Sequence, residues 1–445
     1  MWSPTRRQLM GGLASVSALS FAPETSHAAP RMAVNKHVLP NGLTLLSHRD
    51  PRLPVVAMEV RYLVGSAHER KGRSGFAHLF EHLMFQGSRS YPGEYFAPYE
   101  PIGGVVNGTT NVDRTNYFER VPAAYLELPI WMESDRMGGL LDALDQKKLD
   151  NQRDVVKNER RQRYENPPYG LVPKLMQNNL YPEGHPYQHT TIGSHADLTA
   201  ATLDDVRNFF REYYVPSNAY VTLAGAFDED RALKLIERYF GSLPAGKRTP
   251  MPVAALPPQP TNRIEHPDKV RLPRVHFVWH TPALYKEGDA AMDIFASLLT
   301  SGKTSRLYQP LVYEQQMAKD VGAYQRSMAL SSMFVVQATA APGVSVQKLS
   351  DALRVSLEKA LQTPPTKDEF DRVLNGWKKS FFGRVESVIS KATTISTYEH
   401  IAGNANYLNA DLERYTALTP ESVLAQVKRY IDPEKALAID VVPRA

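Results

Sequence analysis

Apolar and polar positions alternate along two short segments near the start of the chain. Residues 42–50 and 55–65 show this pattern on either side of the proline-containing turn 51–54. A period of two predicts strands, and the short turn predicts that they are neighbours in one sheet. A further strand is predicted over 273–283, and apolar residues at helical spacing predict helices over 75–85, 125–148, 151–165, 287–300 and 303–317. This mixture indicates an α+β protein in which sheets are covered by helices.

Two distant segments repeat one pattern. Residues 202–225 and 419–442 align without a gap, and each has a helix N-cap threonine, an amphipathic helix, a proline turn and a β-prone run. The residues that are identical at matching positions are Thr202 and Thr419, Val206 and Val423, Tyr213 and Tyr430, and Pro216 and Pro433. The repeat predicts an internal duplication, with two homologous α/β two-layer domains.

A proline-rich stretch separates the two copies. Residues 245–268 lack periodic apolar positions and contain many prolines, which is typical of a semi-rigid linker. We therefore expect an N-terminal domain over 30–244 and a homologous C-terminal domain over 269–445.

The N-terminus has the order of an export signal. Two arginines precede an apolar run and then small residues at Ser26 and Ala28, so residues 1–28 are interpreted as a cleaved signal peptide. The pair Arg6 and Arg7 is compatible with either a twin-arginine signal or an ordinary secretory signal. Both routes predict a periplasmic mature protein.

Composition excludes several classes of function. The chain has 445 residues and no cysteine, which rules out disulfides, thiolate zinc ligands and a cysteine nucleophile. Its net charge is +5, but lysine and arginine are interspersed with acidic residues, so no nucleic acid partner is expected. No long apolar run follows the signal segment, and no integral membrane segment is expected in the mature chain.

The segment "HLFEH" carries the candidate chemistry. In a helix His78 and His82 lie one turn apart on the same face, where both imidazoles can reach one metal ion. Glu81 lies on that face too and can accept a proton from a water molecule bound there. The alternative is a helix with two structural histidines, but this order of residues is uncommon by composition alone.

Catalytic zinc usually has a third protein ligand, and the charged helix over 150–170 offers candidates. Val155, Val156 and Tyr164 are its predicted buried positions, and Glu159 lies near that side. Several other carboxylates share this helix, so spacing alone leaves the choice of Glu159 open.

The order H-x-x-E-H is the inverzincin signature, and residues 75–88 resemble the pitrilysin, insulysin and mitochondrial processing peptidase family almost position for position. The likeness continues through residues 65–70, 103–122, 155–167, 184–193 and 301–314. It implies a bacterial two-domain, zinc-bearing subunit with two homologous α/β domains in a clamshell arrangement.

The resemblance also implies roles for single residues. His78, His82 and Glu159 correspond to the ligands of one Zn²⁺ per chain, and Glu81 to the general base that activates zinc-bound water. An edge strand that pairs with extended peptide corresponds to Gly104, Val105, Val106, Asn107, Gly108 and Thr109. Gln152 stands where many members have a second glutamate that supports the zinc site, and a neutral amide there adds no negative charge.

A larger departure lies in the second half. Val312 and Lys319 replace an arginine and a tyrosine that, in many members, reach the peptide and the developing oxyanion. Valine cannot donate a hydrogen bond, and lysine is a mobile point charge rather than a fixed phenol. We therefore expect the catalytic subunit of a heterodimer, whose homologous partner without the zinc motif supplies the Arg/Tyr pair. A chain that acts alone or as a homodimer is the alternative.

These observations predict a zinc-dependent endopeptidase that hydrolyses short or unfolded peptides. Two alternatives stay open: a non-catalytic binding or assembly subunit of the same family, and a peptidase dedicated to maturing one precursor.

Overall fold

The computed structural model describes residues 32–444, so the signal peptide expected over 1–28 lies outside the described residues. The elements of the first half are β1 (Asn35–Val38), β2 (Thr44–Arg49), β3 (Val55–Tyr62), α1 (Phe76–Leu83), β4 (Val105–Thr110), β5 (Thr115–Pro122), α2 (Glu127–Ala143), α3 (Gln146–Arg160), α4 (Val172–Leu180), α5 (His195–Ala200), α6 (Leu203–Tyr213), β6 (Ala219–Gly225) and α7 (Glu229–Phe240). Those of the second half are β7 (Arg263–Asp268), β8 (Arg274–Thr281), α8 (Asp289–Thr300), β9 (Ala318–Arg326), β10 (Ser332–Ala340), α9 (Val346–Gln362), α10 (Lys367–Gly383), α11 (Val388–Thr397), α12 (Leu408–Thr416), α13 (Pro420–Val427) and β11 (Leu437–Pro443). None of the helices within residues 32–444 is long and apolar enough to cross a bilayer.

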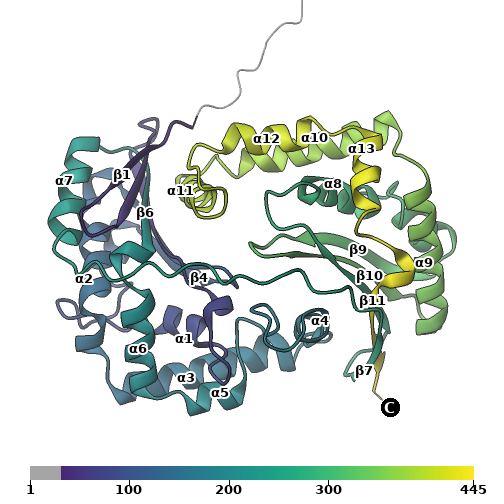
Figure 1. The fold of residues 1–445 in the computed structure, drawn as a ribbon, viewed down its shortest axis with the longest axis horizontal. Helices are drawn as coiled ribbons and strands as arrows, with labels where there is room; N and C mark the ends of the chain where they lie inside the picture. Colours follow the sequence, from purple (N-terminus) through teal and green to yellow (C-terminus); the bar gives the residue numbers. More distant parts are fainter. Residues whose placement is uncertain (1–31, 445) are drawn as a thin grey trace, which may run out of the picture. The chain divides into compact units, whose positions relative to one another are not determined.

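Each half contains one sheet (Figure 1), and five strands of the first sheet have the same order as the five strands of the second, with β1 as an additional edge strand. The first runs β1-β2-β6-β3-β5-β4 and the second runs β7-β11-β8-β10-β9. In both, the last strand in sequence pairs parallel with one neighbour (β6 with β2, β11 with β7) and antiparallel with the other. The predicted duplication is therefore confirmed at the level of topology.

The repeated helix caps have equivalent geometry. Thr202 and Thr419 each accept a hydrogen bond from the backbone N–H three residues later, in a reciprocal capping box. A 3₁₀ turn that begins at Pro216 or Pro433 follows the helix and leads into β6 or β11. The sequence repeat thus corresponds to the helix and turn that precede β6 in the first sheet and β11 in the second.

The expectation that residues 42–50 and 55–65 form neighbouring strands is wrong. Strand β6 lies between β2 and β3, and the five-residue connection passes over its end. There the Asp50 N–H donates to the Gly225 carbonyl (2.7 Å) and the Ala226 N–H donates to the Val55 carbonyl (2.9 Å). Hydrophobic period identifies a strand, but its neighbours depend on segments distant in sequence.

Other predicted boundaries also shift. The break between the helices expected over 125–148 and 151–165 falls at residues 144–145, because Asp145 caps α3 by accepting from the Lys148 N–H (2.8 Å). The expected linker over 245–268 is shorter, since β7 pairs with β11 within it. The helix expected over 303–317 is reduced to a π-helical turn, Gln309–Glu314, because Gln316 has φ of 51° and the chain then enters β9.

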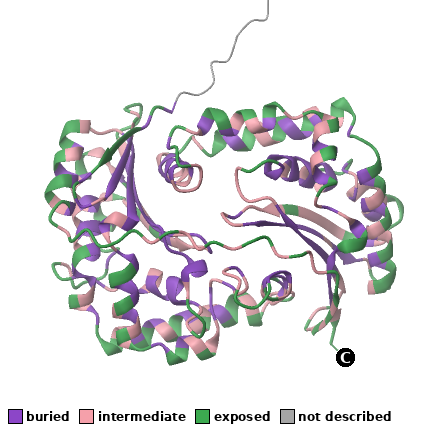
Figure 2. Ribbon diagram, in the orientation of Figure 1, coloured by how far each residue is buried: buried purple, intermediate pink, exposed green. Residues whose placement is uncertain are grey.

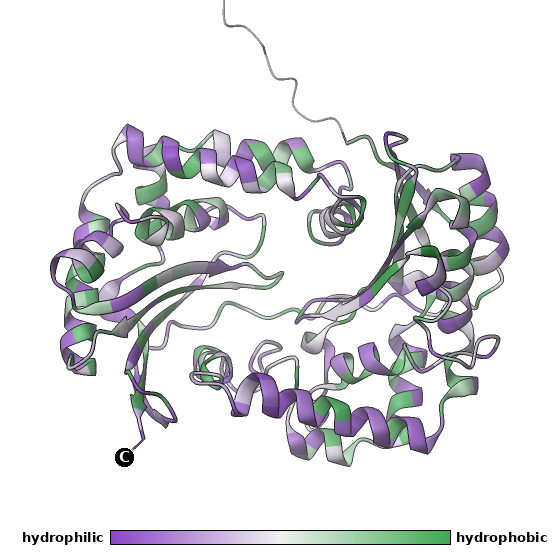
Figure 3. Ribbon diagram, turned by 180° about the vertical axis from the view of Figure 1, so that it is seen from behind, coloured by the Kyte–Doolittle hydropathy of each residue, from purple (hydrophilic) through white to green (hydrophobic). Residues whose placement is uncertain are grey.

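Both sheets are covered on both faces, and one cover of each comes from the other half. Helices α1, α2, α6 and α7 pack on one face of the first sheet, and α11 of the second half contacts the opposite face at β3 and β6. Reciprocally, α4 of the first half packs on β8 and β11 of the second sheet. Figure 2 accordingly shows buried colour along the central strands, and Figure 3 shows hydrophilic and hydrophobic stretches alternating along the covering helices. The exchanged helices α4 and α11 join the two halves.

The contact between α11 and the first sheet is close because small residues form it. Ala57, Ala224 and Ala392 are fully buried against one another. Next to them the hydroxyls of Thr222 and Ser396 are 2.7 Å apart, and the Arg61 guanidinium donates to the Thr393 carbonyl (3.2 Å). This contact has no room for a larger side chain.

We predict that Ala392→Leu lowers the free energy of unfolding by about 1–3 kcal/mol, because added methylene groups overpack a filled core. Urea or thermal denaturation measures the change. Ala196→Leu, at an exposed position of helix α5, is the matched control and should stay within about 0.5 kcal/mol. Equal unfolding midpoints for both variants would contradict the close packing of α11.

Candidate metal centre

Helix α1 has one apolar face and one face that carries polar side chains. Its apolar residues are buried in the first core, and Gly75 begins it at φ 92°. A Cβ on Gly75 would lie 2.8 Å from the Ile192 carbonyl oxygen, so the close approach requires glycine. The rings of His78 and His82 project from the other face, with centroids 4.8 Å apart.

Helix α3 brings Glu159 to these two histidines. The Glu159 Oε2 atom lies 3.2 Å from His82 Nε2 and 3.7 Å from His78 Nε2, and one ligand atom from each residue lies within 4.8 Å of the others. Tetrahedral zinc with bonds of about 2.0–2.1 Å needs ligand atoms roughly 3.3 Å apart, so this donor set fits the ion. No other group of three potential ligands meets this test within residues 32–444.

The predicted burial of α3 is partly wrong. Val156 is fully buried, as expected, and Tyr164 is half-buried. Val155, however, is 39% exposed, because the buried face of the helix runs through Leu149, Gln152 and Val156. Glu159 lies beside this face, and the fold brings it to the histidines.

Glu81 lies on the same side of α1 and is held by the neighbouring strand. The Thr110 hydroxyl of β4 donates to Glu81 Oε2 (2.6 Å). Burial raises the pKa of Glu81, while the hydrogen bond from Thr110 lowers it. A carboxylate that is partly shielded from water and fixed in orientation is suited to accept and return a proton.

The cluster opens into a cavity of about 550 Å³ beside β4, the edge strand of the first sheet. Gly108 sits at its centre, where a Cβ would lie 3.2 Å from the Glu81 side chain and 3.0 Å from Tyr117. This glycine lets the edge strand approach α1 closely. The lining residues are His78, Glu81, His82, Phe85, Gln86, Phe96, Asn107, Gly108, Thr109, Thr110, Gln152, Glu159 and Arg163.

The residues predicted for substrate contact divide into two groups. Asn107, Gly108 and Thr109 line the cavity. Gly104 precedes the strand, and Val105 and Val106, at its start, do not line the cavity, although Val106 packs against the first core. Gln152 is buried in the cavity wall, as its predicted supporting role requires.

Sequence reasoning missed five residues that line this cavity, Gln86 among them. Thr110 orients Glu81, and Arg163 forms an ion pair with Glu159 Oε1 (2.8 Å) from one helical turn later. Phe85 and Phe96 stack with ring centroids 4.9 Å apart and form an apolar wall. The position of Phe85 three residues after His82, close to one helical turn, and the i,i+4 spacing of Glu159 and Arg163 are the sequence signals for two of them.

Charge around Glu159 favours its ionised form. Burial alone would raise the pKa of this carboxyl, but the hydrogen bond with His82 and the charges of the histidines and Arg163 lower it overall. Arg163 engages one oxygen and leaves the other directed at the histidines. Such orientation of a ligand is the usual task of groups surrounding a metal site.

A buried carboxylate fixes the start of α1. Glu69 is fully buried and accepts hydrogen bonds from the backbone N–H groups of Gly75 (2.9 Å) and Ala77 (2.8 Å). His189 contacts the same carboxylate (2.8 Å) from the loop before α5. The carboxylate satisfies two otherwise unpaired helix donors and opposes the positive end of the helix dipole.

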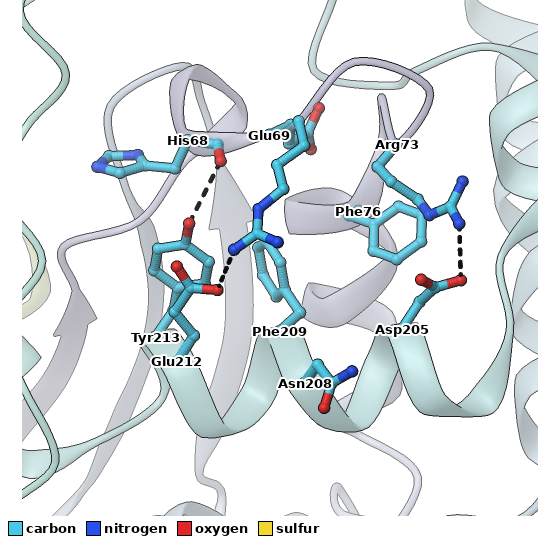
Figure 4. A pocket seen from close by; sticks show the side chains of 10 residues that line it. His68, Glu69, Arg73, Phe76, Asp205, Asn208, Phe209, Glu212 and Tyr213 are labelled. Carbon is cyan, nitrogen blue, oxygen red and sulfur yellow. Dashed lines mark hydrogen bonds and ion pairs between the residues drawn. The ribbon is translucent and has the colours of Figure 1, made fainter.

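The segment before α1 is also tied to α6 on the outer side, as Figure 4 shows. Arg70 pairs with Glu212 (3.0 Å) and Arg73 with Asp205 (3.2 Å), around a hollow of about 100 Å³. None of the metal-cluster residues lines this hollow. Both ion pairs are at least partly exposed to solvent, so they stabilise the start of α1 less than the buried carboxylate of Glu69 does.

The second half repeats the scaffold without the metal cluster. Helix α8, which takes the place of α1 between β8 and β9, has no histidine or glutamate. Val312 lies in the π-helical turn and packs against the second core, and Lys319 is an exposed residue at the start of β9. Neither side chain lines the metal cavity.

Comparisons with known proteins agree with this architecture. Residues 44–193 match the family model described as insulinase (peptidase family M16), and residues 200–376 match the one described as peptidase M16 inactive domain. The zinc protease PqqE of Helicobacter pylori is 31% identical over 394 residues, which cover 87% of this chain and 88% of that protein. An uncharacterized zinc protease of Bacillus subtilis, YmxG, is 23% identical over 91% of this chain and 98% of its own length. The chain belongs to the M16 (insulinase) family of peptidases.

Solved structures show the same fold. A protease from Helicobacter pylori matches with a TM-score of 0.86 and 27% identity, over 93% of this chain and all of that one. The first half of the periplasmic protease PqqL from Escherichia coli matches with a TM-score of 0.75 and 18% identity, over 93% of both chains. At that lower identity the likeness concerns the fold alone.

We predict that Glu69→Ala lowers the free energy of unfolding by about 3–5 kcal/mol, because it leaves buried backbone donors and His189 without their partner. Denaturant titration measures the loss. Glu212→Ala, which removes an exposed ion pair on the same segment, should cost about 1 kcal/mol or less. Similar losses in both variants would mean that Glu69 does not anchor α1.

Proposed function

We propose that this chain is a zinc-dependent endopeptidase that hydrolyses short or unfolded peptides. The observation that carries the proposal is the convergence of His78, His82 and Glu159 beside β4, an edge strand that pairs with β5 on one side only. The same cavity contains a half-buried carboxylate, Glu81, that is not needed as a metal ligand. The names of the similar zinc proteases agree with this chemistry.

His78, His82 and Glu159 hold the ion in this proposal. Bound there, zinc supplies Lewis acidity toward the scissile carbonyl and lowers the pKa of water. Glu81 takes a proton from the attacking water and delivers it to the leaving amine. Thr110 holds the Glu81 carboxylate in position for both transfers.

Peptide binds along β4 as an added strand. Its backbone pairs with the open edge at Asn107–Thr109, which places one peptide bond over the cluster. An extended backbone is needed for this pairing, so short or unfolded chains are favoured over folded proteins. Phe85 and Phe96 offer an apolar surface to a neighbouring substrate side chain.

The active form in this proposal is a heterodimer. Val312 and Lys319 cannot supply the two donors that many family members carry in the second domain, and both lie outside the metal cavity. A homologous subunit that has the Arg/Tyr pair, and lacks the zinc motif, supplies them. The signal-like order of residues 1–28 supports a periplasmic location for the mature chain.

A second candidate function is a non-catalytic binding or assembly subunit. The match of residues 200–376 to a domain described as inactive favours it. It predicts bound peptide without turnover. A peptidase dedicated to one precursor is a third form of the proposal, and it differs from the first only in the range of substrates cleaved.

We predict that Glu81→Gln retains the metal but lowers kcat by about 10²–10⁴, because the amide cannot accept a proton. His82→Ala should lose the metal as well. Metal content is measured by elemental analysis, and turnover is measured with an internally quenched peptide. Glu413→Gln, an exposed change of the same kind, is the control. Undiminished turnover in Glu81→Gln would remove this residue from its role, and a metal-loaded wild type that cleaves no peptide would favour the binding subunit.

We predict that the purified chain cleaves peptides at least 10²-fold more slowly alone than when mixed with a homologous subunit carrying the Arg/Tyr pair, because one missing oxyanion donor costs about 10²–10³ in rate. Initial rates across a titration of the second subunit measure the effect. Equal rates with and without it would show that the chain needs no partner.

A further inference from the structure

A second, smaller hollow lies between α4 of the first half and the second sheet. It has a volume of about 190 Å³ and is lined by Tyr169, Val172, Pro173, Met176, Arg274, His276, Tyr324, Arg326, Met333 and Gln337. Sites for drug-sized ligands usually measure about 300–1,000 Å³. The hollow therefore suits a single side chain or small group rather than a whole small molecule.

The strand register explains why polar side chains gather there. His276 on β8 lies opposite Gln337 on β10, which lies opposite Gly322 on β9. The side chains of His276 and Gln337 point to the face that α4 covers, and Gly322, which has no side chain, leaves space beside them. Arg274, two residues from His276, and Arg326, four residues from Gly322, point to the same face. Helix α4 packs on β8 and β11, and the hollow lies where β9 and β10 extend beyond it.

Neither guanidinium group in this hollow forms an ion pair with a carboxylate of residues 32–444, although the charge of Arg326 partly offsets the burial that raises the pKa of Asp113. Arg274 donates from Nε to the Thr339 hydroxyl (2.8 Å) and lies over the Tyr169 ring at 3.7 Å. Arg326 is half-buried, and its side chain makes no hydrogen bond or ion pair with another residue of the described chain. No aspartate or glutamate lines the hollow.

By contrast, the buried Arg136 and the half-buried Arg414 each pair with carboxylates. Near the hollow, Asp320 accepts instead from the Thr339 hydroxyl (2.8 Å), and Asp268 accepts from the Tyr169 N–H (2.8 Å). A partly desolvated guanidinium without an anion costs free energy that a bound carboxylate recovers.

The hollow is joined to the metal cavity by a short stretch of chain. Glu159 and Arg163 line the metal cavity, and Tyr169 and Val172 line the hollow. Tyr164 lies between them in sequence: burial raises its pKa, while the guanidinium of Arg326 is close enough to lower it. Arg163 and Tyr169 are six residues apart, so their Cα atoms lie within about 20 Å of each other, a distance that an extended peptide of roughly six residues spans.

We propose that this hollow, the Arg274–Arg326 pocket, binds an aspartate or glutamate side chain of the peptide substrate. The inference rests on the proposed peptidase function and adds a substrate preference to it. Arg326 donates to the carboxylate from β9, and Arg274 donates from β8. The aromatic ring of Tyr169 keeps the Arg274 guanidinium in place.

The test uses a set of peptides with one cleavable bond, in which a single aspartate is moved through the positions on both sides of that bond. Each peptide has a matched control with asparagine at the same position. We expect kcat/KM to be about tenfold higher for aspartate than for asparagine at one position or two adjacent ones, through a lower KM. The ratio should fall to near one in Arg326→Gln and in Arg274→Gln.

Charge reversal and a surface control sharpen the test. Arg326→Glu should prefer lysine over aspartate at that same position. Arg271→Gln removes a charge from an exposed residue outside the pocket and should keep the wild-type ratio. Thermal unfolding of each variant shows whether it is folded.

Equal kcat/KM for aspartate and asparagine at every position would overturn the proposal, as would a preference that survives both glutamine substitutions. Absence of all cleavage would instead count against the proposed peptidase function. In that case the dissociation constants of the same peptides for Glu81→Gln protein, measured by fluorescence anisotropy, decide the question. A preference for aspartate that disappears in Glu81→Gln/Arg326→Gln supports the pocket, and equal constants overturn it.

Discussion

Each sheet of this protein needs a cover on both faces, and half of that cover comes from the other domain. The central strands β3, β6, β8 and β11 are apolar or tightly packed on both sides, so neither sheet could be stable with one face in water. Helices α4 and α11 supply the missing faces by exchange. The two halves therefore fold as one unit, although they arose as copies.

This exchange also positions the chemistry. The segment that leaves the metal cavity at Arg163 must reach the second sheet as α4, so it carries structure from the first half directly to the second. A fixed α4 in turn fixes the hollow that contains Arg274 and Arg326. The same helix that packs on the second sheet also lines the Arg274–Arg326 pocket.

The two copies show how one scaffold can lose or keep a function. The order of the five shared strands, the helix caps and the exchanged helix are common to both halves. The H-x-x-E-H motif of His78, Glu81 and His82 is present on α1 and absent from the equivalent helix α8. In the second copy the equivalent helix, α8, is mostly apolar and contributes to the core. The buried residues determine the fold, whereas a few polar residues determine the chemistry of a site. The second half could therefore stay folded without a metal cluster.

Local features of this chain could be predicted because their causes are local. The helical spacing of His78, Glu81 and His82, the capping threonines Thr202 and Thr419, and the duplication they mark all depend on residues a few positions apart. The family resemblance added the choice of Glu159, which spacing in a helix with several carboxylates left open.

The tertiary structure decided what depends on distant partners. It placed β6 between β2 and β3, turned Val155 outward, and set Thr110 and Arg163 against the carboxylates of Glu81 and Glu159. It also exchanged α4 and α11 and left the guanidinium of Arg326 without an ion-pair partner among residues 32–444. Strand neighbours, buried ion pairs and shared cores are formed between segments far apart in sequence, and periodicity within one segment does not specify its partner.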